Sequence, residues 1–305
     1  MKVGVNLLNF GPGASPGSLL RWTQVAEALG YHLVMISDHV TITPDVAQIY
    51  PAPFYDPFLT LAWLAGQTRS IEIGTTVIIL PYRHPLQVAR LVSNLDQLSG
   101  GRFIFGVGVG WAKEEFAALG VDFTQRGAMT DEYLELIHRT WEGETTSFRG
   151  TFVQADEIWN GPPPRQRPHP PVWIGGNGKA GRRRAVRFGA AWHPISIRMD
   201  WLINEGLPDL RAMAEQLERP VPLFCPRIKL NLTDDPLPDD ERRAGEGTIE
   251  QVHADLAALE EMGAEYVLLD TYDGNSETTR DHEQAWSMFA ALAEKVLDLT
   301  GETVR

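Results

Sequence analysis

The chain has 305 residues, of which 43% are hydrophobic, so it can bury a large core. Its formal net charge of −13, from 40 acidic and 27 basic residues, argues against nucleic acid and anionic membrane surfaces as bulk partners. No apolar run approaches the ~20 residues that span a bilayer, and the N-terminus lacks the layout of a signal peptide. The single cysteine, Cys225, cannot form an intrachain disulfide, which is typical of a reducing compartment. We therefore expect a cytoplasmic, globular protein that faces small molecules.

Strand and helix patterns alternate along the whole chain. Each expected strand is a short apolar run, and the segment after it carries apolar residues at helical spacing. Two helix starts are explicit: Asp56 precedes Pro57, and Thr248 with Gln251 forms a capping box. The expected strands are residues 2–9, 32–37, 71–80, 102–109, 171–176, 190–197, 223–232 and 266–269. Eight strand–helix pairs predict an α/β fold, a (β/α)8 TIM barrel formed by one domain over residues 1–305.

Three stretches interrupt this alternation. Residues 41–55 follow the second expected strand, residues 146–171 contain a run of three prolines, and residues 234–247 are polar. The proline-rich stretch cannot continue a helix and suits an ordered excursion over the surface. We expect loop insertions at the C-terminal face of the barrel, with residues 41–55 and 148–171 covering the substrate side.

Polar side chains follow the second expected strand, where Ser37, Asp38 and His39 stand in a row. Active sites of these barrels lie at the C-terminal ends of the strands, and there both Asp38 and His39 can reach a ligand. A turn-capping aspartate and a solvated histidine explain the same residues equally well on local sequence alone. Thr76 and Val77, in the third expected strand, are most simply β-branched strand residues.

Three glycines, Gly106, Gly108 and Gly110, alternate in the fourth expected strand and therefore share one face of it. Glycine weakens a strand, so such a row indicates that a flat or bulky group approaches the backbone closely. Crowding between neighbouring strands of the barrel is the competing explanation. The spacing is not a dinucleotide fingerprint, because the third glycine at the required offset and the acidic residue after a second strand are missing.

A glycine-rich turn follows the fifth expected strand. Gly175, Gly176, Asn177 and Gly178 precede a helix that carries three consecutive arginines, beginning with Arg182. Such a turn can present backbone N–H groups to an anion, and the helix N-terminus adds positive potential. Arginines near a helix start are unfavourable unless an anion compensates them. A plain glycine turn with exposed arginines is the alternative, but two independent features favour a site for a cofactor phosphate.

The motifs of several other enzyme classes are absent. The sequence has no HExxH, CxxC, GxSxG or P-loop, so zinc peptidases, dithiol redox proteins, α/β-hydrolases and nucleotide hydrolases lack support. His169, His193, His253 and His282 are scattered and show no ligand spacing, so we expect no metal site and assign most of them to the surface or to satisfied polar positions.

Taken together, four segments resemble the bacterial luciferase-like monooxygenase superfamily, and the resemblance spans essentially the whole chain. They are Ser37-Asp38-His39, Gly74-Thr75-Thr76-Val77, Gly106 to Trp111 with Ala112-Lys113-Glu114-Glu115-Phe116, and PHPPVWIGG at residues 168–176. The runs GVGVGWAKEEFAALGV and PHPPVWIGG are similar to the actinobacterial branch that depends on the 8-hydroxy-5-deazaflavin coenzyme F420. Members are (β/α)8 barrels with flavin or deazaflavin at the strand ends, so the resemblance implies an oxidoreductase.

The resemblance also implies roles for individual residues. Asp38 would contact the ring region of the deazaflavin, and His39 would lie close to its reacting face. The Thr76–Val77 bond would be a non-prolyl cis peptide whose bulge supports the ring from behind. Gly108 and Gly110 would let the ring lie close to the fourth strand. The phosphate of the ribityl tail would be held by Gly175, Gly176, Asn177 and Gly178, with Arg182.

The sequence departs at one position from the deazaflavin-dependent sugar-phosphate dehydrogenases of the superfamily. There a glutamate after the strand-four glycines acts as an acid, whereas this chain has Trp111. A tryptophan cannot transfer a proton, so dehydrogenation of glucose 6-phosphate is not expected, and Trp111 instead predicts an apolar wall for the substrate. His39 is then the candidate proton donor or acceptor.

We therefore expect hydride transfer between F420 and a mostly apolar small organic substrate. An FMN-dependent luciferase-like monooxygenase is the alternative within the same class. A catalytically silent flavin- or deazaflavin-binding protein is the alternative from another class. Apolar helix faces often mediate dimers in this superfamily, so a homodimer is a further expectation of the resemblance.

Overall fold

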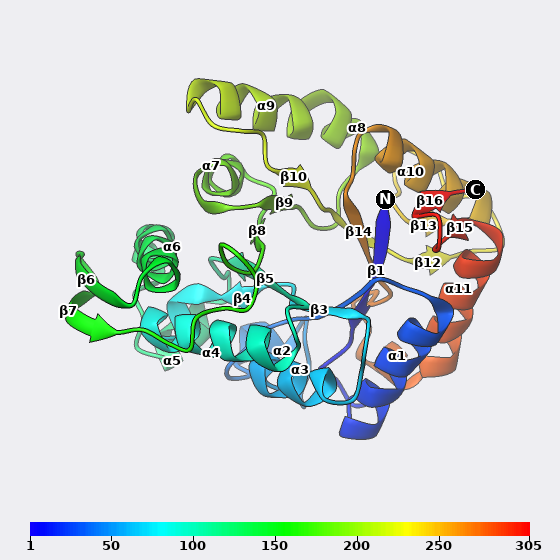
Figure 1. Cartoon of the computed structure of the whole chain (residues 1–305). Coiled ribbons are helices and arrows are strands. Elements are labelled where there is room, and N and C mark those ends of the chain that lie inside the picture. The colour runs from blue at the N-terminus through cyan, green and yellow to red at the C-terminus, as the bar shows by residue number, and fades with distance from the viewer.

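A buried parallel sheet with eight strand positions lies at the centre of the molecule, as Figure 1 shows, and two of these positions are each filled by two short strands. The computed structural model describes residues 1–305. The strands are continuous apolar runs because helices cover their outer face and a packed interior covers the other. In chain order the positions are β1 (Lys2–Leu7), β2 (Leu33–Ile36), β3 (Glu72–Thr75) with β4 (Ile78–Ile79), β5 (Phe103–Gly108), β8 (Val172–Gly175), β9 (Ala191–His193), β10 (Leu223–Phe224) with β11 (Arg227–Lys229), and β14 (Tyr266–Asp270).

The sheet closes on itself at its seventh position. β10 pairs with β9, β11 pairs with β14, and only Cys225 and Pro226 separate β10 from β11. A bridge between Ile195 and Arg227 also joins the end of the sixth position to the seventh. Proline has no N–H to donate to a strand ladder, which explains the interruption at Pro226. The sheet is therefore the (β/α)8 barrel predicted from the sequence.

A helix follows each of the eight positions on the outside of the barrel (Figure 1). Asp56 accepts a hydrogen bond from the Leu59 N–H at the start of α3, and Thr248 and Gln251 form the predicted capping box of α10. The helices are α1 (Pro16–Leu29), α3 (Pro57–Ala65), α4 (Pro85–Leu98), α6 (Arg126–Glu142), α7 (Lys179–Phe188), α9 (Leu207–Gln216), α10 (Ile249–Glu261) and α11 (His282–Lys295). None of them is long and apolar enough to cross a lipid bilayer.

The barrel interior changes from apolar to polar along the strands. An inner cluster includes Leu33, Ile104 and Trp173, which come early in their strands. The last residues of β9 and β14, His193 and Asp270, are polar and equally buried. The apolar layer closes the barrel below the C-terminal strand ends, so a small molecule can approach the buried polar groups only from those ends.

Two predicted strands are wrong in their continuity. The third, expected over residues 71–80, is broken between β3 and β4 by the Thr76–Val77 peptide bond, which is cis as the family resemblance implied. The seventh, expected over residues 223–232, ends in a separate piece, β12 (Asn231–Leu232), which pairs with β13 (Glu246–Gly247). Pairing with neighbouring segments, rather than hydrophobicity, sets these breaks.

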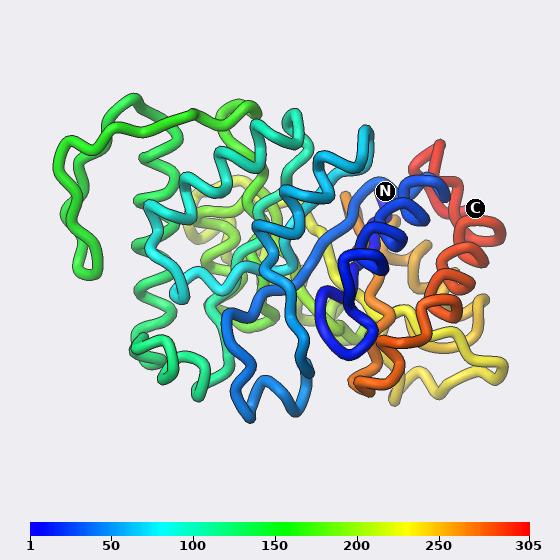
Figure 2. Tube along the Cα trace, turned by 90° about the horizontal axis from the view of Figure 1, so that it is seen from below, coloured from blue at the N-terminus to red at the C-terminus, as the bar shows by residue number.

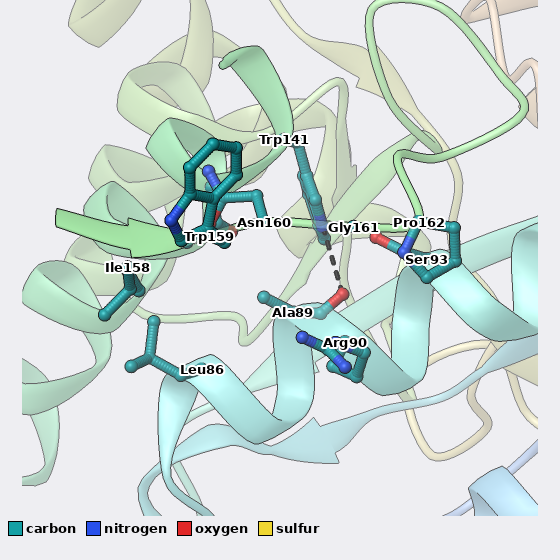
Figure 3. A pocket seen from close by; sticks show the side chains of 11 residues that line it. Leu86, Ala89, Arg90, Ser93, Trp141, Ile158, Trp159, Asn160, Gly161 and Pro162 are labelled. Atoms are coloured by element: carbon teal, nitrogen blue, oxygen red, sulfur yellow. Dashed lines mark hydrogen bonds between the residues drawn. The ribbon is translucent and has the colours of Figure 1, made fainter. Parts of the chain in front are cut away.

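The proline-rich excursion contains an antiparallel hairpin, β6 (Thr145–Arg149) with β7 (Gln154–Trp159). Figure 2 shows it at one margin of the molecule, beside α6. It packs over α4 and α6, where the Trp141 indole donates to the Ala89 carbonyl at 3.2 Å (Figure 3). The prediction that residues 148–171 cover the substrate side is wrong, because a connection from a helix to the next strand returns to the N-terminal end of the barrel. Residues 41–55, which follow β2, do lie at the C-terminal end.

We expect the carboxylate of Asp96 to be the main anchor of this excursion. It is fully buried and accepts hydrogen bonds from the Gln166 backbone N–H at 2.8 Å and from the Gln166 side chain at 2.7 Å. Asp96→Ala should lower the free energy of unfolding by about 2–3 kcal/mol, because both donors lose a charged acceptor. The neighbouring Gln97→Ala loses one exposed bond to Pro163 and should cost less than about 1 kcal/mol. Equal values in chemical denaturation would contradict this assignment.

Candidate active site

A cavity of about 250 Å³ opens at the C-terminal ends of the strands. It brings together His39, Asp38, Thr76, Val77, Gly108, Gly110, Trp111, Gly175 and Gly176 from the predicted site. The other residues that line it are Ser37, Tyr50, Ile79, Val109, His193, Ile195 and Arg227. Three predicted residues, Asn177, Gly178 and Arg182, lie outside this lining.

The floor of the cavity is the turn at Thr76 and Val77. The Thr76 carbonyl accepts a hydrogen bond from Arg227 Nη1 at 3.0 Å, and the Thr76 hydroxyl lies 2.9 Å from His193 Nε2. His193 Nδ1 lies 2.5 Å from the Cys225 carbonyl, which can only accept, so Nδ1 carries the proton and Nε2 accepts from Thr76. The cis peptide is thus fixed from β9 and from β11.

The glycines of β5 make room for this turn. A Cβ atom on Gly106 would lie 1.8 Å from the Thr75 carbonyl oxygen, and one on Gly108 would lie 2.5 Å from Val77 Cγ2. Crowding by the neighbouring strand therefore explains both positions, and it was the competing explanation for the glycine row. The backbones of Gly108 and Gly110 still line the cavity.

Asp38 supports the site rather than presenting a free carboxylate to it. Its two oxygens accept from Arg83 at 2.6 and 2.8 Å, and one also accepts from the Ile79 N–H at 2.9 Å. Arg83 in turn contacts Asp56 at 3.2 Å. The charge of the carboxylate is balanced by Arg83, and its bond to Ile79 pins the end of β4 to the end of β2, so it would add little repulsion toward an anionic ligand.

His39 is paired with Glu115, a residue of the short helix α5 (Lys113–Ala118). The distance from His39 Nδ1 to Glu115 Oε2 is 2.6 Å, and both side chains are almost wholly buried. Burial alone would raise the pKa of Glu115, but the hydrogen bond and charge of His39 and the N–H groups of Thr41 and Val40 hold it below its usual value. The other ring nitrogen of His39 makes no hydrogen bond with the protein and is available to a ligand.

Aromatic side chains surround His39 on the outer side of the cavity. The Trp111 ring stands edge-on to His39 at 5.8 Å between centroids and is 42% exposed. Tyr50 lies 5.4 Å from His39 and 6.5 Å from Trp111. The Tyr272 hydroxyl donates to the Ile49 carbonyl and so ties the segment that carries Tyr50 to the end of β14. These rings form an aromatic rim on this side of the cavity, and the apolar substrate wall expected at Trp111 stays a prediction.

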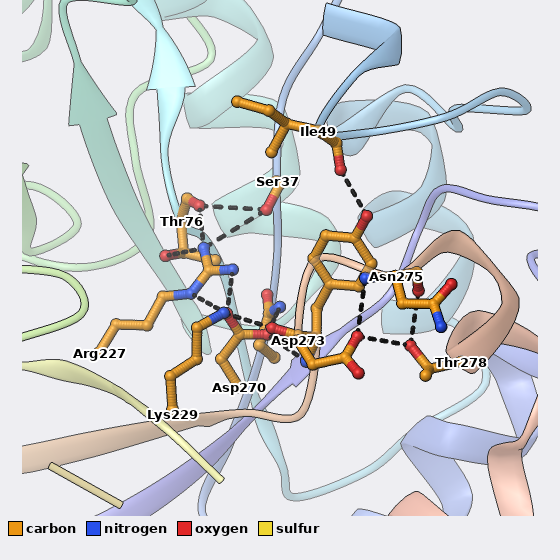
Figure 4. A network of polar contacts seen from close by, with 11 residues as sticks. Ser37, Ile49, Thr76, Arg227, Lys229, Asp270, Asp273, Asn275 and Thr278 are labelled. Carbon is orange, nitrogen blue, oxygen red and sulfur yellow. Dashed lines mark hydrogen bonds and ion pairs between the residues drawn. The ribbon is translucent and has the colours of Figure 1, made fainter. Parts of the chain in front are cut away.

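A buried ion-pair network lies beside the floor, as Figure 4 shows. Asp270 Oδ2 lies 2.9 Å from Arg227 Nη2 and 3.3 Å from Lys229 Nζ. Burial alone would raise the pKa of Asp270, but Arg227 and Lys229 lower it to about 2. Arg227 uses its remaining nitrogen on Thr76, so the network joins the end of the barrel sheet to the cavity floor.

The glycine turn after β8 is shaped by its own neighbours. Gly176 has φ 115°, which only glycine adopts readily. The Asn177 side chain bonds both backbone groups of Ile195 at 2.8 and 2.9 Å. Arg182 donates to the Asn177 carbonyl at 2.5 Å and pairs with Asp209 at 2.9 Å. Arg184 pairs with Asp131 at 2.5 Å, so two of the three arginines have protein partners, although Arg182 Nε is buried without one.

Sequence reasoning missed three residues of the site. His193 was grouped with scattered histidines, although it lies within a predicted strand, and it ends the observed strand β9. Arg227 was an available signal, because an arginine inside an apolar strand of a barrel needs a buried partner. Glu115 lies in one of the four segments that resemble the family, but no role followed from that resemblance. Nothing in the local sequence of α5 shows that its carboxylate reaches His39.

We expect the stability of the protein to fall as the pH drops from about 6.5 to about 4. Burial lowers the pKa of His193 from 6.5 to about 4; the Cys225 carbonyl opposes this shift and Arg227 reinforces it. The unfolded chain therefore takes up this proton at a higher pH than the folded chain, which favours unfolding across that window. His138, whose pKa burial also lowers to about 4, adds to the slope.

His193→Gln should flatten part of this dependence in denaturation curves measured across the same pH range. His253→Gln, a change at the protein surface, is the matched control and should keep the parent slope. A His193→Gln slope that equals the parent slope would show that His193 is not held neutral by the fold.

Comparison with known proteins gives one family. The family model described as luciferase-like monooxygenase matches residues 1–236. An uncharacterized protein of Mycobacterium tuberculosis is 31% identical over 191 residues, 58% of this chain and 66% of that protein. The 4-hydroxyprotoasukamycin monooxygenase of Streptomyces nodosus subsp. asukaensis is 33% identical over 206 residues, 66% of this chain and 53% of that enzyme. The matched part of the chain thus spans about half to two thirds of the length of these relatives.

Two solved structures share the fold. An F420-dependent secondary alcohol dehydrogenase in complex with an F420–acetone adduct has a TM-score of 0.76 at 18% identity, over 92% of this chain and 96% of that chain. The oxygenating constituent of 3,6-diketocamphane monooxygenase of Pseudomonas putida, in complex with FMN, has a TM-score of 0.76 at 16% identity, over 97% of both chains. These identities show the shared fold alone. The family model covers most of the sequence, and the chain belongs to the luciferase-like monooxygenase family.

Proposed function

We propose that the protein is an oxidoreductase that transfers a hydride between F420 and a mostly apolar small organic substrate. The cavity at the strand ends carries the proposal, because it combines a backbone floor, an aromatic wall and one histidine nitrogen without a protein partner. The charged groups at the cavity, Asp38, Glu115 and Arg227, are each paired with a neighbouring side chain. Such a site can accept a flat, neutral ring and can exchange a proton through His39.

The residues around the cavity fit a flat cofactor with an anionic tail. The Thr76–Val77 peptide and the backbones of Gly108 and Gly110 would face the ring, and Asp38 would support them through Ile79. The turn from Gly175 to Gly178 would hold the tail phosphate with backbone N–H groups at the N-terminus of α7. When bound, the deazaflavin supplies the carbon that accepts or returns the hydride.

Arg182 has a different role in this proposal from the one that the sequence implied. Its guanidinium is engaged by Asp209 and by the Asn177 carbonyl. We therefore propose that Arg182 maintains the shape of the turn, and that the backbone of the turn makes the contacts with the phosphate. Trp111 and Tyr50 form the substrate side, where their rings would exclude water and favour an apolar substrate.

An FMN-dependent monooxygenase is the second candidate. It is favoured by the matched 4-hydroxyprotoasukamycin monooxygenase and by the flavin-dependent trigonelline monooxygenase of Acinetobacter baylyi, which is 27% identical over 173 residues, 56% of this chain and 46% of that component. Deazaflavin lacks the ring nitrogen that stabilises an oxygen adduct, so oxygen uptake during turnover would favour FMN. A silent binding protein would bind a cofactor tightly and turn over none of a broad panel of substrates.

Fluorescence titration of the whole chain with F420 and with FMN tests the proposal. We expect saturable binding of F420 and at least about tenfold weaker binding of FMN, a difference of about 1.4 kcal/mol. Tighter binding of FMN together with oxygen uptake would replace the proposal by the monooxygenase. Binding of neither cofactor would refute both candidates.

Gly176→Ala should weaken cofactor binding by about tenfold. Its φ of 115° is strained for alanine, by about 1–2 kcal/mol, so the turn would move and misplace its N–H groups. Gly263→Ala is the matched control, because Gly263 also has a positive φ, of 85°, with open space around its Cβ position, and precedes β14 at the other end of the barrel. Both variants should lose stability, but only Gly176→Ala should lose affinity. Equal affinities would remove the turn from the cofactor site.

We also propose that the enzyme acts in the cytoplasm as a homodimer. Its one thiol, Cys225, is buried, and two exposed leucines, Leu59 on α3 and Leu98 on α4, leave apolar surface outside the barrel. Sedimentation equilibrium should give about twice the chain mass of 34.0 kDa, and a single-chain mass at all concentrations would contradict the dimer.

A further inference from the structure

Glu115 is a buried carboxylate whose only basic side-chain partner is a histidine. Its side chain is 0% exposed, and no arginine or lysine forms an ion pair with it. One oxygen, Oε1, accepts from the backbone N–H groups of Val40 at 2.7 Å and Thr41 at 3.1 Å. The other oxygen, Oε2, lies 2.6 Å from His39 Nδ1. A buried carboxylate persists in the charged form only with partners of this kind.

This arrangement decides which ring nitrogen of His39 carries the proton. The two backbone donors favour an ionised Glu115, and an ionised carboxylate only accepts hydrogen bonds. His39 Nδ1 must therefore donate, and in the neutral ring the lone pair then lies on Nε2. Nε2 has no protein partner, and His39 lines the cavity.

We propose that Glu115 is a positioning residue that holds His39 as the Nδ1–H tautomer, so that Nε2 is the proton acceptor of the site. The substrate or a bound water would give its proton to Nε2, and the charge of the resulting imidazolium would be balanced by Glu115. This inference rests on the proposed function for its role in turnover, but the tautomer itself is a property of the chain without cofactor.

Glu115 also fixes where the ring stands. Its bonds to Val40 and Thr41 hold the backbone just after His39 against α5. A second tie joins the same two segments: the Glu114 N–H donates to Asp45 at 3.0 Å, and the Asp45 N–H donates to Glu114 at 3.4 Å. Glu114 is exposed and does not contact His39, so it offers a matched control that removes the same charge one residue away.

The other ionisable groups around the pair cannot replace Glu115. Asp38 is held by Arg83. Tyr82 has a buried hydroxyl without a hydrogen-bond partner, and burial and the charge of Glu115 raise its pKa. Burial likewise raises the pKa of Tyr50, which packs on His39. Both phenols stay neutral, so Glu115 provides the only negative charge in contact with the imidazole.

Nitrogen-15 NMR of histidine-labelled whole chain, without cofactor, tests the tautomer directly. His39→Asn identifies the signals of His39. In the parent protein we expect Nδ1 to be protonated and Nε2 to be unprotonated in the neutral ring. The opposite tautomer in the parent would overturn the proposal without reference to any variant.

Glu115→Gln should remove this preference, because a neutral amide can donate as well as accept a hydrogen bond. Glu114→Gln should leave the parent tautomer unchanged. Glu115→Asp, which keeps the charge, should retain the parent tautomer at least in part and serves if Glu115→Gln does not fold. A parent-like tautomer of His39 in folded Glu115→Gln would overturn the positioning role.

Turnover gives a separate readout. In Glu115→Gln, kcat should fall more than KM rises, whereas Glu114→Gln should leave both constants unchanged. If the tautomer is confirmed but no cofactor binds, the proposed function fails while the role of Glu115 in orienting His39 stands. If cofactor binds and His39 is protonated on Nε2, the reverse holds.

Discussion

The site depends on one buried cation, the guanidinium of Arg227. An arginine inside a barrel needs a counter-charge and acceptors for its N–H groups, because water cannot supply them there. Asp270 supplies the charge from β14, and the Thr76 carbonyl supplies an acceptor from the turn between β3 and β4. One side chain thus connects distant strands of the barrel at the height where the cavity begins. The turn that forms the floor is held there, and the glycines of β5 leave the space that it occupies.

The other buried charges around the cavity are also paired with neighbouring side chains. Asp38 is neutralised by Arg83, Glu115 is held by His39, and Asp270 is held by Arg227. Each pair uses the charged group to fix backbone or ring geometry rather than to offer it to a ligand. The cavity consequently presents backbone, aromatic rings and the free nitrogen of one histidine. A site of this kind supplies orientation and a path for a proton, and it leaves the redox chemistry to a cofactor.

The fold was predictable because each element carries a local signal, such as an apolar strand run, proline at a helix start or a capping box. Much of the cavity followed from topology, since Asp38, Thr76, Gly108 and Gly176 lie at the ends of four successive strands that converge in a barrel. The pairings were not predictable, because Glu115 lies 76 residues from His39 and Asp270 lies 43 residues from Arg227. The excursion after α6 was placed at the wrong face because composition was weighed and connectivity was not. The partners of Arg182, which are Asp209 and the Asn177 carbonyl, are likewise invisible in the sequence.

We propose that a flavin-like ring rests on the floor made by Thr76 and Val77. A crystal structure of the whole chain soaked with F420 tests this proposal most directly. We expect a ring packed against the Thr76–Val77 peptide, a tail phosphate within hydrogen-bonding distance of the N–H groups of Gly176 to Gly178, and His39 Nε2 beside the open face of the ring. A ring bound elsewhere, or a phosphate held at another set of strand ends, would contradict it.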